Sequence, residues 1–267
     1  MTSWPAWAQM WTAAALVYAG CKWVTWHAAP PAAPGWRQAA YLLAWPGLDA
    51  PGFCAAGVRP DRVAPAEWIA ASASTAGGAL LFFAAARAIP PVDLYVTGWV
   101  GMTGLVLMLH FGAFHLLSCT WRTAGIQARP LMHRPLAASS LADFWGRRWN
   151  TAFRDLTHRF LFQPLAARLG SRWGVATGFL FSGLVHDLVI SAPAAGGYGG
   201  PTVYFALQGA AMLFERSAVG RRLGLGHGWR GWLFAMVMLV APVRLLFHRP
   251  FVVGVVVPFM RALGALS

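Results

Sequence analysis

The amino-acid sequence predicts an all-α protein that crosses a membrane several times, and two observations support that fold class. Apolar residue types make up 58% of the 267 residues and charged residues only 11%, whereas soluble domains have roughly 45–50% and about 25%. The apolar residues also gather in stretches close to the ~20 residues that a transmembrane helix needs. We therefore expect a bundle of six or seven spans with interfacial amphipathic helices, in one membrane domain over 1–267 with its core motifs in 140–191.

Seven apolar stretches are candidates for these spans, and the last is short and contains Pro258, so we expect six or seven. The stretch 41–53 is also apolar, but prolines and glycines interrupt it. Because proline removes a backbone donor, we expect this stretch to lie at the interface or to re-enter rather than to span. In chain order the predicted spans are 4–20, 68–89, 92–119, 173–191, 200–214, 229–247 and 251–266.

The net charge of +13 is distributed over the segments between the apolar stretches. If the loop 120–172 faces the cytoplasm, 18 of the 21 Lys and Arg residues lie on that side, as the positive-inside rule requires. A nucleic-acid-binding protein would gather its cations on one soluble module instead. We therefore expect an integral membrane protein, in the inner membrane if the cell is bacterial, with membrane lipids as partners and no nucleic acid.

Several residue types argue against a disulfide framework, a metal site or a cleaved leader. The three cysteines have no CxxC spacing, and no basic residue precedes the first apolar run, so we expect that run to be retained in the membrane. His110 and His115 share a predicted span, but a five-residue separation puts them about 140° apart, and no carboxylate accompanies them in the sequence. We expect no metal, and we expect Glu215 to be an interface residue.

A first motif lies in 140–154, where Ser140 and Asp143 have the spacing of a helix start. At 100° per residue, a helix continuing from there would carry polar residues on one face and an aromatic stripe on the other. That pattern predicts an amphipathic helix at a membrane interface. The polar face would consist of Asp143, Arg147, Asn150 and Arg154, and the stripe of Trp145, Trp149 and Phe153.

A second motif is His186 with Asp187, inside a stretch that otherwise carries no charge from 173 to 191. An ionisable pair in an apolar span is costly, so it indicates a functional site. Ser182 and Gly183 lie one helical turn before His186 and predict a small, open surface where a hydroxyl group approaches. Asp187 lies 100° from His186, so we expect it to pair with an Arg or a backbone group of another span.

The two motifs, FWGRRWN at 144–150 and SGLVHD at 182–187, together resemble the wax synthase-like branch of the membrane-bound O-acyltransferase superfamily, MBOAT. The order of the spans and the WPG element at 45–47 support the resemblance. It implies an enzyme that moves an acyl group from acyl-CoA to a hydroxyl, with Asn150 and His186 at the positions of the Asn and His that such enzymes use.

Two departures from the family pattern bear on the substrate. Asp187 stands where plant members more usually have Glu, and 267 residues is short for the family. Both leave the expected reaction class intact.

The expected roles follow from acyl-transfer chemistry. His186 would take the hydroxyl proton as general base, and Asn150 would donate its amide to the carbonyl oxygen or hold the acceptor. Guanidinium groups match phosphates, so Arg147, Arg148 and Arg154 would bind the CoA head group. We expect acyl-CoA as a co-substrate and no cofactor. The substrate pocket would include Trp149, Ser182, Gly183 and Asp187.

Plainer interpretations stay open for each of these residues. His186 could instead be a packed intramembrane histidine, and Asn150 could be a helix cap. Each Arg could be present only because its loop carries the positive charge that membrane topology requires. Another class of protein is a small transporter or channel in which His186 and Asp187 relay protons or ions. An inactive scaffold with the same fold is a third. We expect the acceptor to be a lipophilic alcohol, because an apolar lining cannot satisfy the hydroxyls of a sugar.

Overall fold

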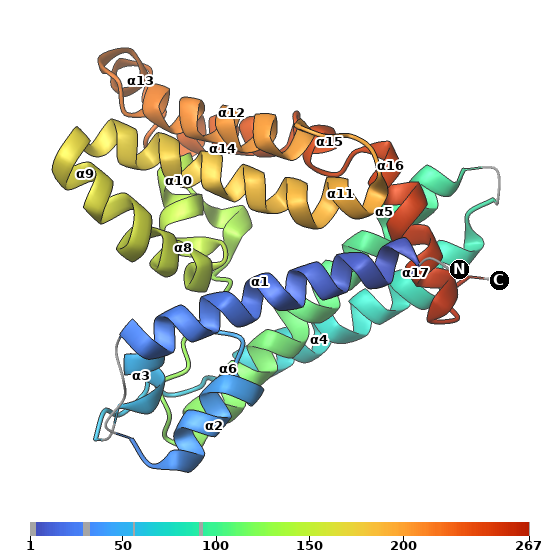
Figure 1. The fold of residues 1–267 in the computed structure, drawn as a ribbon, viewed down its shortest axis with the longest axis horizontal. Helices are drawn as coiled ribbons and strands as arrows, with labels where there is room; N and C mark the ends of the chain where they lie inside the picture. The colour runs from blue at the N-terminus through green and yellow to red at the C-terminus, as the bar shows by residue number, and fades with distance from the viewer. Residues whose placement is uncertain (1–3, 29–32, 56, 91–92, 267) are drawn as a thin grey trace. The chain divides into compact units, whose positions relative to one another are not determined.

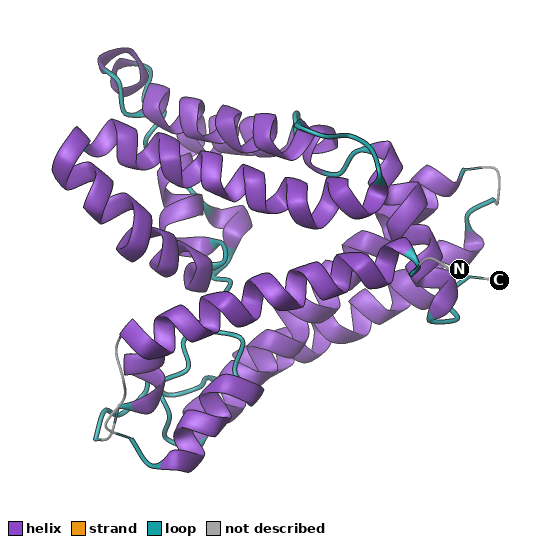
Figure 2. Cartoon of the chain, in the orientation of Figure 1, coloured by secondary structure: helices purple, strands orange, loops and turns teal. Residues whose placement is uncertain are grey.

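A computed structural model describes residues 4–28, 33–55, 57–90 and 93–266, and every regular element in these ranges is a helix (Figures 1 and 2). No strand occurs among them. The predicted all-α class is therefore confirmed.

Four helical segments are long and apolar enough to cross a membrane, namely Pro65–Ala88, Leu94–Thr123, Ser171–Ala194 and Gly228–Leu246. They correspond to four of the seven predicted spans, although the predicted start at Val92 lies outside the described residues. The other three stretches also form helices, but these fall outside that set. The total number of spans stays a prediction.

The chain divides into two compact units. The first consists of Met1–Ala15 and His133–Phe259, and the second of Leu16–Met132 and Met260–Ser267. Helix α1 (Ala6–Ala28) and helix α17 (Val257–Ala262) each begin in the first unit and continue into the second. The prediction of one domain over 1–267 stays a prediction.

In the second unit, α4 packs closely on α5 and η2. A Cβ atom built on Gly78 would lie 2.6 Å from the carbonyl oxygen of Gly104, so only glycine permits this approach of two backbones. The helices of this unit are α2 (Gly35–Ala44), α3 (Ala50–Cys54), α4 (Pro65–Phe83), η1 (Ala85–Ala88), α5 (Leu94–Val106), η2 (Leu107–Ala113) and α6 (Phe114–Thr123).

The interrupted stretch 41–53 forms the end of α2, an extended segment and the start of α3, as its prolines and glycines lead one to expect. Tyr41 and Phe53 are fully buried. The Lys22 ammonium lies 3.5 Å from the centre of the Tyr41 ring and donates to the carbonyls of Tyr41 and Gly47 at 2.7 and 2.6 Å. Burial lowers the pKa of Lys22 to about 7. The WPG element thus supplies a carbonyl ligand to a buried lysine.

In the first unit, the helices α10 and α12 form the largest interface. Thr202 of α12 lies over Gly183, and Phe179 of α10 lies over Gly209, so a small residue on each helix admits a larger one from the other. The elements of this unit after residue 132 are η3 (Pro135–Ala137), α7 (Leu141–Asp143), η4 (Phe144–Arg148), α8 (Thr151–Thr157), η5 (His158–Phe162), α9 (Gln163–Leu169), α10 (Ser171–His186), η6 (Asp187–Ser191), α11 (Ala192–Ala194), α12 (Gly200–Glu215), α13 (Ala218–Arg222), α14 (Gly228–Val240), α15 (Val243–Leu246), α16 (Arg249–Phe251) and η7 (Val252–Val256).

The prediction of a single amphipathic helix from Ser140 to beyond Arg154 is wrong. The Ser140 side chain does cap the helix start, accepting the amide of Asp143 at 3.0 Å. The helix then ends at Trp149, which is extended, and Asn150 is left-handed with φ 41°. Asn tolerates this conformation, and its side chain starts α8 by accepting the amide of Phe153 at 3.3 Å. The predicted polar face is therefore divided between two helices.

Candidate active site

His186 is the last residue of α10 and directly precedes the π-helical turn η6. Its Nδ1 lies 2.7 Å from the carbonyl oxygen of Ser182. Because a carbonyl only accepts hydrogen bonds, Nδ1 must carry the proton, and Nε2 of the neutral ring is then the basic nitrogen. The local backbone therefore selects one tautomer of the residue predicted to be the general base.

Phe205 of α12 packs on this imidazole with 4.5 Å between ring centres. Trp145, from the first motif, packs in turn on Phe205 at 5.6 Å and on Phe179 of α10 at 5.7 Å. The two sequence motifs are thus connected through one aromatic side chain of α12. Sequence reasoning did not single out Phe205.

Gln208 was also missed, although a fully buried amide in an apolar stretch is a signal in itself. The Trp145 indole donates to its carbonyl oxygen at 3.4 Å, and its amide nitrogen donates to the carbonyl of Met238 at 2.6 Å. A buried polar group that is bonded at both ends specifies how its neighbours are arranged. Gln208 therefore holds the first motif against α12 and α14.

Glu215, at the end of α12, is buried rather than an interface residue, so that prediction is wrong. Its carboxylate accepts the amide of Leu141 at 2.6 Å and the amide of Ala142 at 3.3 Å. These are unsatisfied donors of the first turn of α7, and a carboxylate at a helix start is favourable. Burial raises the pKa of Glu215, and these two amides offset part of that rise.

Asp143 gathers two of the three arginines predicted to bind the acyl donor. It accepts from Nε of Arg147 at 2.9 Å, from Nε of Arg148 at 2.6 Å and from the amide of Ser139 at 3.1 Å. Burial alone would raise the pKa of Asp143, but the bonds from Arg148 and Ser139 outweigh it and leave that pKa below its usual value.

The three arginines differ in what they present to solvent. The Arg147 side chain is 76% exposed, whereas that of Arg148 is 22% exposed and also donates to the carbonyl of Arg134 at 3.3 Å. Arg154 pairs with Asp155 at 3.0 Å, away from Asp143. Arg147 has the most exposed side chain of the three. The role of these arginines toward CoA stays a prediction.

Asn150 has a structural task as the cap of α8, which was the plainer interpretation of this residue. The helix that it starts packs on α10, because the ring of Phe153 stacks on that of Phe181 at 6.4 Å. Trp149, beside Asn150, stacks on Phe144 at 5.5 Å. The predicted catalytic role of Asn150 and pocket role of Trp149 stay predictions.

The open surface expected before His186 is absent at Gly183. A Cβ atom built there would lie 2.6 Å from Cα of Thr202, so α12 fills that space. The Ser182 hydroxyl donates along its own helix to the carbonyl of Gly178 at 3.0 Å. Gly183 therefore serves helix packing, and the expectation of an open notch at this residue is wrong.

Asp187 pairs with backbone groups of another helix, as predicted. Its carboxylate accepts the amides of Gly199 at 2.9 Å and Thr202 at 3.0 Å, the hydroxyl of Thr202, and the hydroxyl of Ser191 at 2.8 Å. These contacts place a negative charge at the start of α12, where unsatisfied amides favour it. Its predicted place in the substrate pocket stays a prediction.

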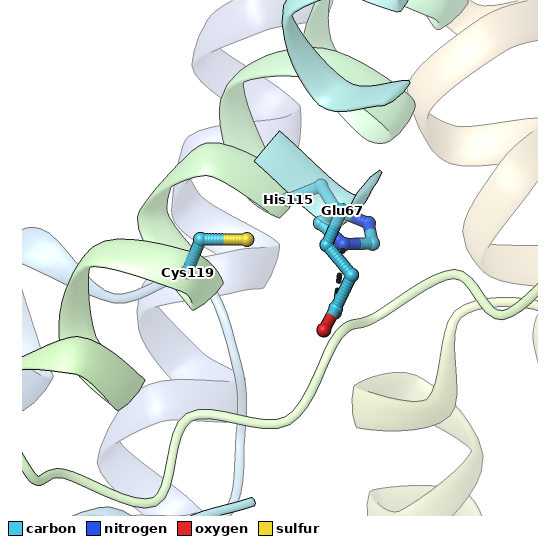
Figure 3. A group of neighbouring side chains, drawn as sticks. All are labelled: Glu67, His115 and Cys119. Carbon is cyan, nitrogen blue, oxygen red and sulfur yellow. Dashed lines mark hydrogen bonds and ion pairs between the residues drawn. The ribbon is translucent and has the colours of Figure 1, made fainter. Parts of the chain in front are cut away.

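A separate polar cluster in the second unit joins Glu67 of α4 to His115 and Cys119 of α6 (Figure 3). Nε2 of His115 lies 3.4 Å from Glu67 Oε2, so the expectation that no carboxylate accompanies this histidine is wrong. Arg122 forms an ion pair with the same oxygen. Its guanidinium already balances the carboxylate charge and would repel a cation, so we assign this cluster to helix packing.

Comparison with known proteins agrees with the motifs. Residues 128–207, which contain both of them, match the profile described as the Membrane bound O-acyl transferase family. The resemblance to these enzymes is thereby confirmed for this region, and the relatives described next confirm the wax synthase-like branch. With four apolar helices of membrane-spanning length, the chain is an integral membrane protein.

Three curated relatives illustrate the similarity. The long-chain-alcohol O-fatty-acyltransferase of Simmondsia chinensis is 38% identical over 74 residues, which are 25% of this chain and 21% of the relative. A protein of Arabidopsis thaliana named probable long-chain-alcohol O-fatty-acyltransferase 3 is 31% identical over 122 residues, 40% of this chain and 34% of the relative. The acyl-CoA–sterol O-acyltransferase 1 of Arabidopsis thaliana is 34% identical over 71 residues, 24% of this chain and 21% of the relative. The chain thus spans a fifth to a third of the length of these relatives.

Proposed function

We propose that this protein is a membrane O-acyltransferase that moves an acyl group from acyl-CoA to the hydroxyl of a lipophilic alcohol. The observation that carries the proposal is the hydrogen bond from His186 Nδ1 to the carbonyl of Ser182 at 2.7 Å, which leaves Nε2 as the base. The matched relatives, which are named as acyltransferases of long-chain alcohols and sterols, support the reaction class.

In the proposed reaction, the alcohol oxygen attacks the thioester carbonyl carbon while Nε2 of His186 takes the hydroxyl proton. The bond between that carbon and sulfur breaks, and the leaving CoA thiolate takes the proton from the imidazolium. An ester and free CoA result, and His186 returns to its neutral form. Asn150 is assigned to the developing negative charge on the carbonyl oxygen or to the acceptor.

The donor is assigned to the side of the loop 120–172, which the distribution of cations predicts to face the cytoplasm. Arg147 is the first contact for the CoA phosphates, because its side chain is the most exposed of the three arginines. Arg148 shares the same carboxylate, and Arg154 lies on the next helix.

The acceptor is assigned to lipophilic alcohols because the groups beside His186 are aromatic. The rings of Phe205, Trp145 and Phe179 offer area for an apolar chain and few partners for additional hydroxyls. The transporter alternative is not supported, since the relatives are acyltransferases by name and Asp187 is bonded to groups that hold α12.

The test is analysis of products by mass spectrometry, with purified protein, an acyl-CoA and matched acceptors: a long-chain primary alcohol, a sterol and a sugar. We expect an ester of at least one alcohol, none of the sugar, and no ester with the His186→Ala variant. Ester formation by His186→Ala at the wild-type rate would contradict the mechanism. Efficient acylation of the sugar, with none of the alcohols, would contradict the acceptor class.

A further inference from the structure

We infer that Asp187, Ser191, Thr202 and His248 form a positioning network that fixes α12 against α10 and, through Phe205, holds the imidazole of His186 in its working orientation. The inference rests on the proposed function, because it treats His186 as the base. None of the four network residues needs to contact a substrate. Their effect would pass through Phe205, which packs on the ring.

The network begins with Asp187, which directly follows His186 in the chain. Each of its carboxylate oxygens accepts a hydrogen bond from one backbone amide at the start of α12. Oδ1 accepts from the amide of Gly199, and Oδ2 accepts from the amide of Thr202. Each oxygen also takes a hydroxyl, from Ser191 and Thr202 respectively. Four donors from two segments thus fix both the position and the rotation of the carboxylate.

His248 extends the network and determines the direction of its hydrogen bonds. Its Nδ1 accepts the amide of Phe251 at 3.2 Å, so in the neutral ring Nε2 carries the proton. Nε2 lies 3.1 Å from the Ser191 hydroxyl and donates to it, and that hydroxyl donates to Asp187 Oδ1 at 2.8 Å. Burial lowers the pKa of His248, and the charge of Asp187 offsets part of that lowering, so the neutral form is the one present near pH 7.

The order of these groups excludes a nucleophilic triad. In a serine hydrolase the histidine lies between the carboxylate and the serine, whereas here the serine lies between the other two. Ser191 is also fully buried. These groups therefore hold the structure rather than attack a substrate.

The mechanical connection to His186 runs along one face of α12. Thr202 and Phe205 are three residues apart, so they lie on the same face. Thr202 is bonded to Asp187 and lies over Gly183, while Phe205 lies on His186. A shift of α12 would therefore move Phe205 away from the imidazole, whose other support is the hydrogen bond to Ser182.

The experiment compares Asp187→Asn and Phe205→Leu with Phe205→Tyr, which keeps the ring, and with two controls. Phe214→Leu removes an exposed aromatic ring from the same helix, and His227→Gln alters an exposed histidine outside the site. The measurements are kcat, KM for each substrate, and the rate at which diethyl pyrocarbonate modifies His186, read from its peptide by mass spectrometry. Thermal unfolding reports whether each variant is folded.

We expect Asp187→Asn and Phe205→Leu to lower kcat by roughly ten- to a hundredfold, since small misplacements of a catalytic group have effects of that size. KM for acyl-CoA should stay within about threefold, because the arginines assigned to the CoA phosphates are untouched. His186 should be modified faster in both variants, Phe205→Tyr should keep the wild-type modification rate because the ring remains, and the Phe214→Leu and His227→Gln controls should behave like wild type. A purely structural role would lower Tm and the active fraction but leave the modification rate in folded protein unchanged.

The outcomes separate this inference from the proposed function. If wild-type protein makes ester and both variants retain wild-type kcat and modification rate, the positioning network is wrong. If wild-type protein makes no ester, the proposed function is wrong, and the modification rate still decides whether the network holds the ring. If Asp187→Asn does not fold, Phe205→Leu carries the test alone, because it leaves all the hydrogen bonds in place.

Discussion

Two aspartates of the same unit, the buried Asp143 and the half-buried Asp187, neutralise their charge in different ways. Asp143 binds two guanidinium groups and one amide. Asp187 binds two hydroxyls and two amides, and no cation contacts it among the described residues. Inside an apolar segment a cation would add its own desolvation cost, whereas backbone dipoles at a helix start come without one. The aspartate of the Arg-rich segment therefore pairs with charge, and the aspartate beside His186 pairs with dipoles.

This difference gives the two positions different tasks. The Asp143 pairs fix Arg148 but leave most of Arg147 exposed, so that region presents positive charge to a ligand. The Asp187 contacts bring no positive charge to the base and align two helices instead. Helix α12 serves both, because Glu215 caps α7 at one of its ends and Asp187 caps α12 at the other.

The largest expected effect is at the residue beside Asp187. His186→Ala should lower ester formation by about 10²–10⁴-fold, since it removes the proton acceptor. The variant should still insert and accumulate, because the Asp187 contacts remain. Ester formation at fixed protein concentration, with the membrane-fraction level as the control, checks this expectation.

Removing the charge of Asp143 should lower the stability of the folded protein, which tests whether this aspartate is paired with charge. Asp143→Asn leaves the part-buried Arg148 without its carboxylate and should destabilise the protein by about 3 kcal/mol. Because the pKa of Asp143 is lowered in the folded protein, its stabilisation is present above about pH 4 and is lost as pH falls below that value. Thermal unfolding in detergent between pH 3 and 7 should show a flatter acid limb for the variant. An unchanged acid limb would mean that Asp143 is not ionically paired.

Alanine substitutions of the two arginines that contact Asp143 should have different kinetic effects. Arg147→Ala should raise KM for acyl-CoA severalfold while KM for the alcohol and Tm stay close to wild type. Arg148→Ala should lower Tm and change KM for acyl-CoA and KM for the alcohol by the same factor, because the Arg148 guanidinium is hydrogen-bonded to Asp143 and to the carbonyl of Arg134. Equal kinetic effects of both substitutions would assign Arg147 to structure as well.

The smallest effect on activity is expected from cysteine substitutions that test the membrane topology. A cysteine at Leu169, after the Arg-rich segment, should resist an impermeant thiol reagent added outside intact cells, whereas one at Tyr198, near the Asp187 contacts, should react. Both native side chains are exposed, at 60% and 67%. Labelling in the reverse pattern would overturn the predicted orientation of the loop 120–172.

The sequence by itself determined the helical class, the family resemblance and the four predicted spans that the structure shows as membrane-length helices. These follow from residue types and spacing along one chain, such as the stretch 173–191, which carries no charge other than that of Asp187. The role of His186 with Asp187 stays a prediction. The sequence also showed that Asp187 needs a partner from elsewhere, because neighbours on one helix point 100° apart.

Only the tertiary structure decided which residues meet. The break at Asn150 depends on a left-handed residue that helical periodicity does not reveal. The space at Gly183, before His186, is filled by Thr202, nineteen residues after Gly183 in the chain. Phe205, Gln208 and Glu215 each act on a motif more than fifteen residues away, through ring packing or buried hydrogen bonds. Such contacts come from the packing of one helix on another, and the pattern along a single helix carries no information about its partner's register.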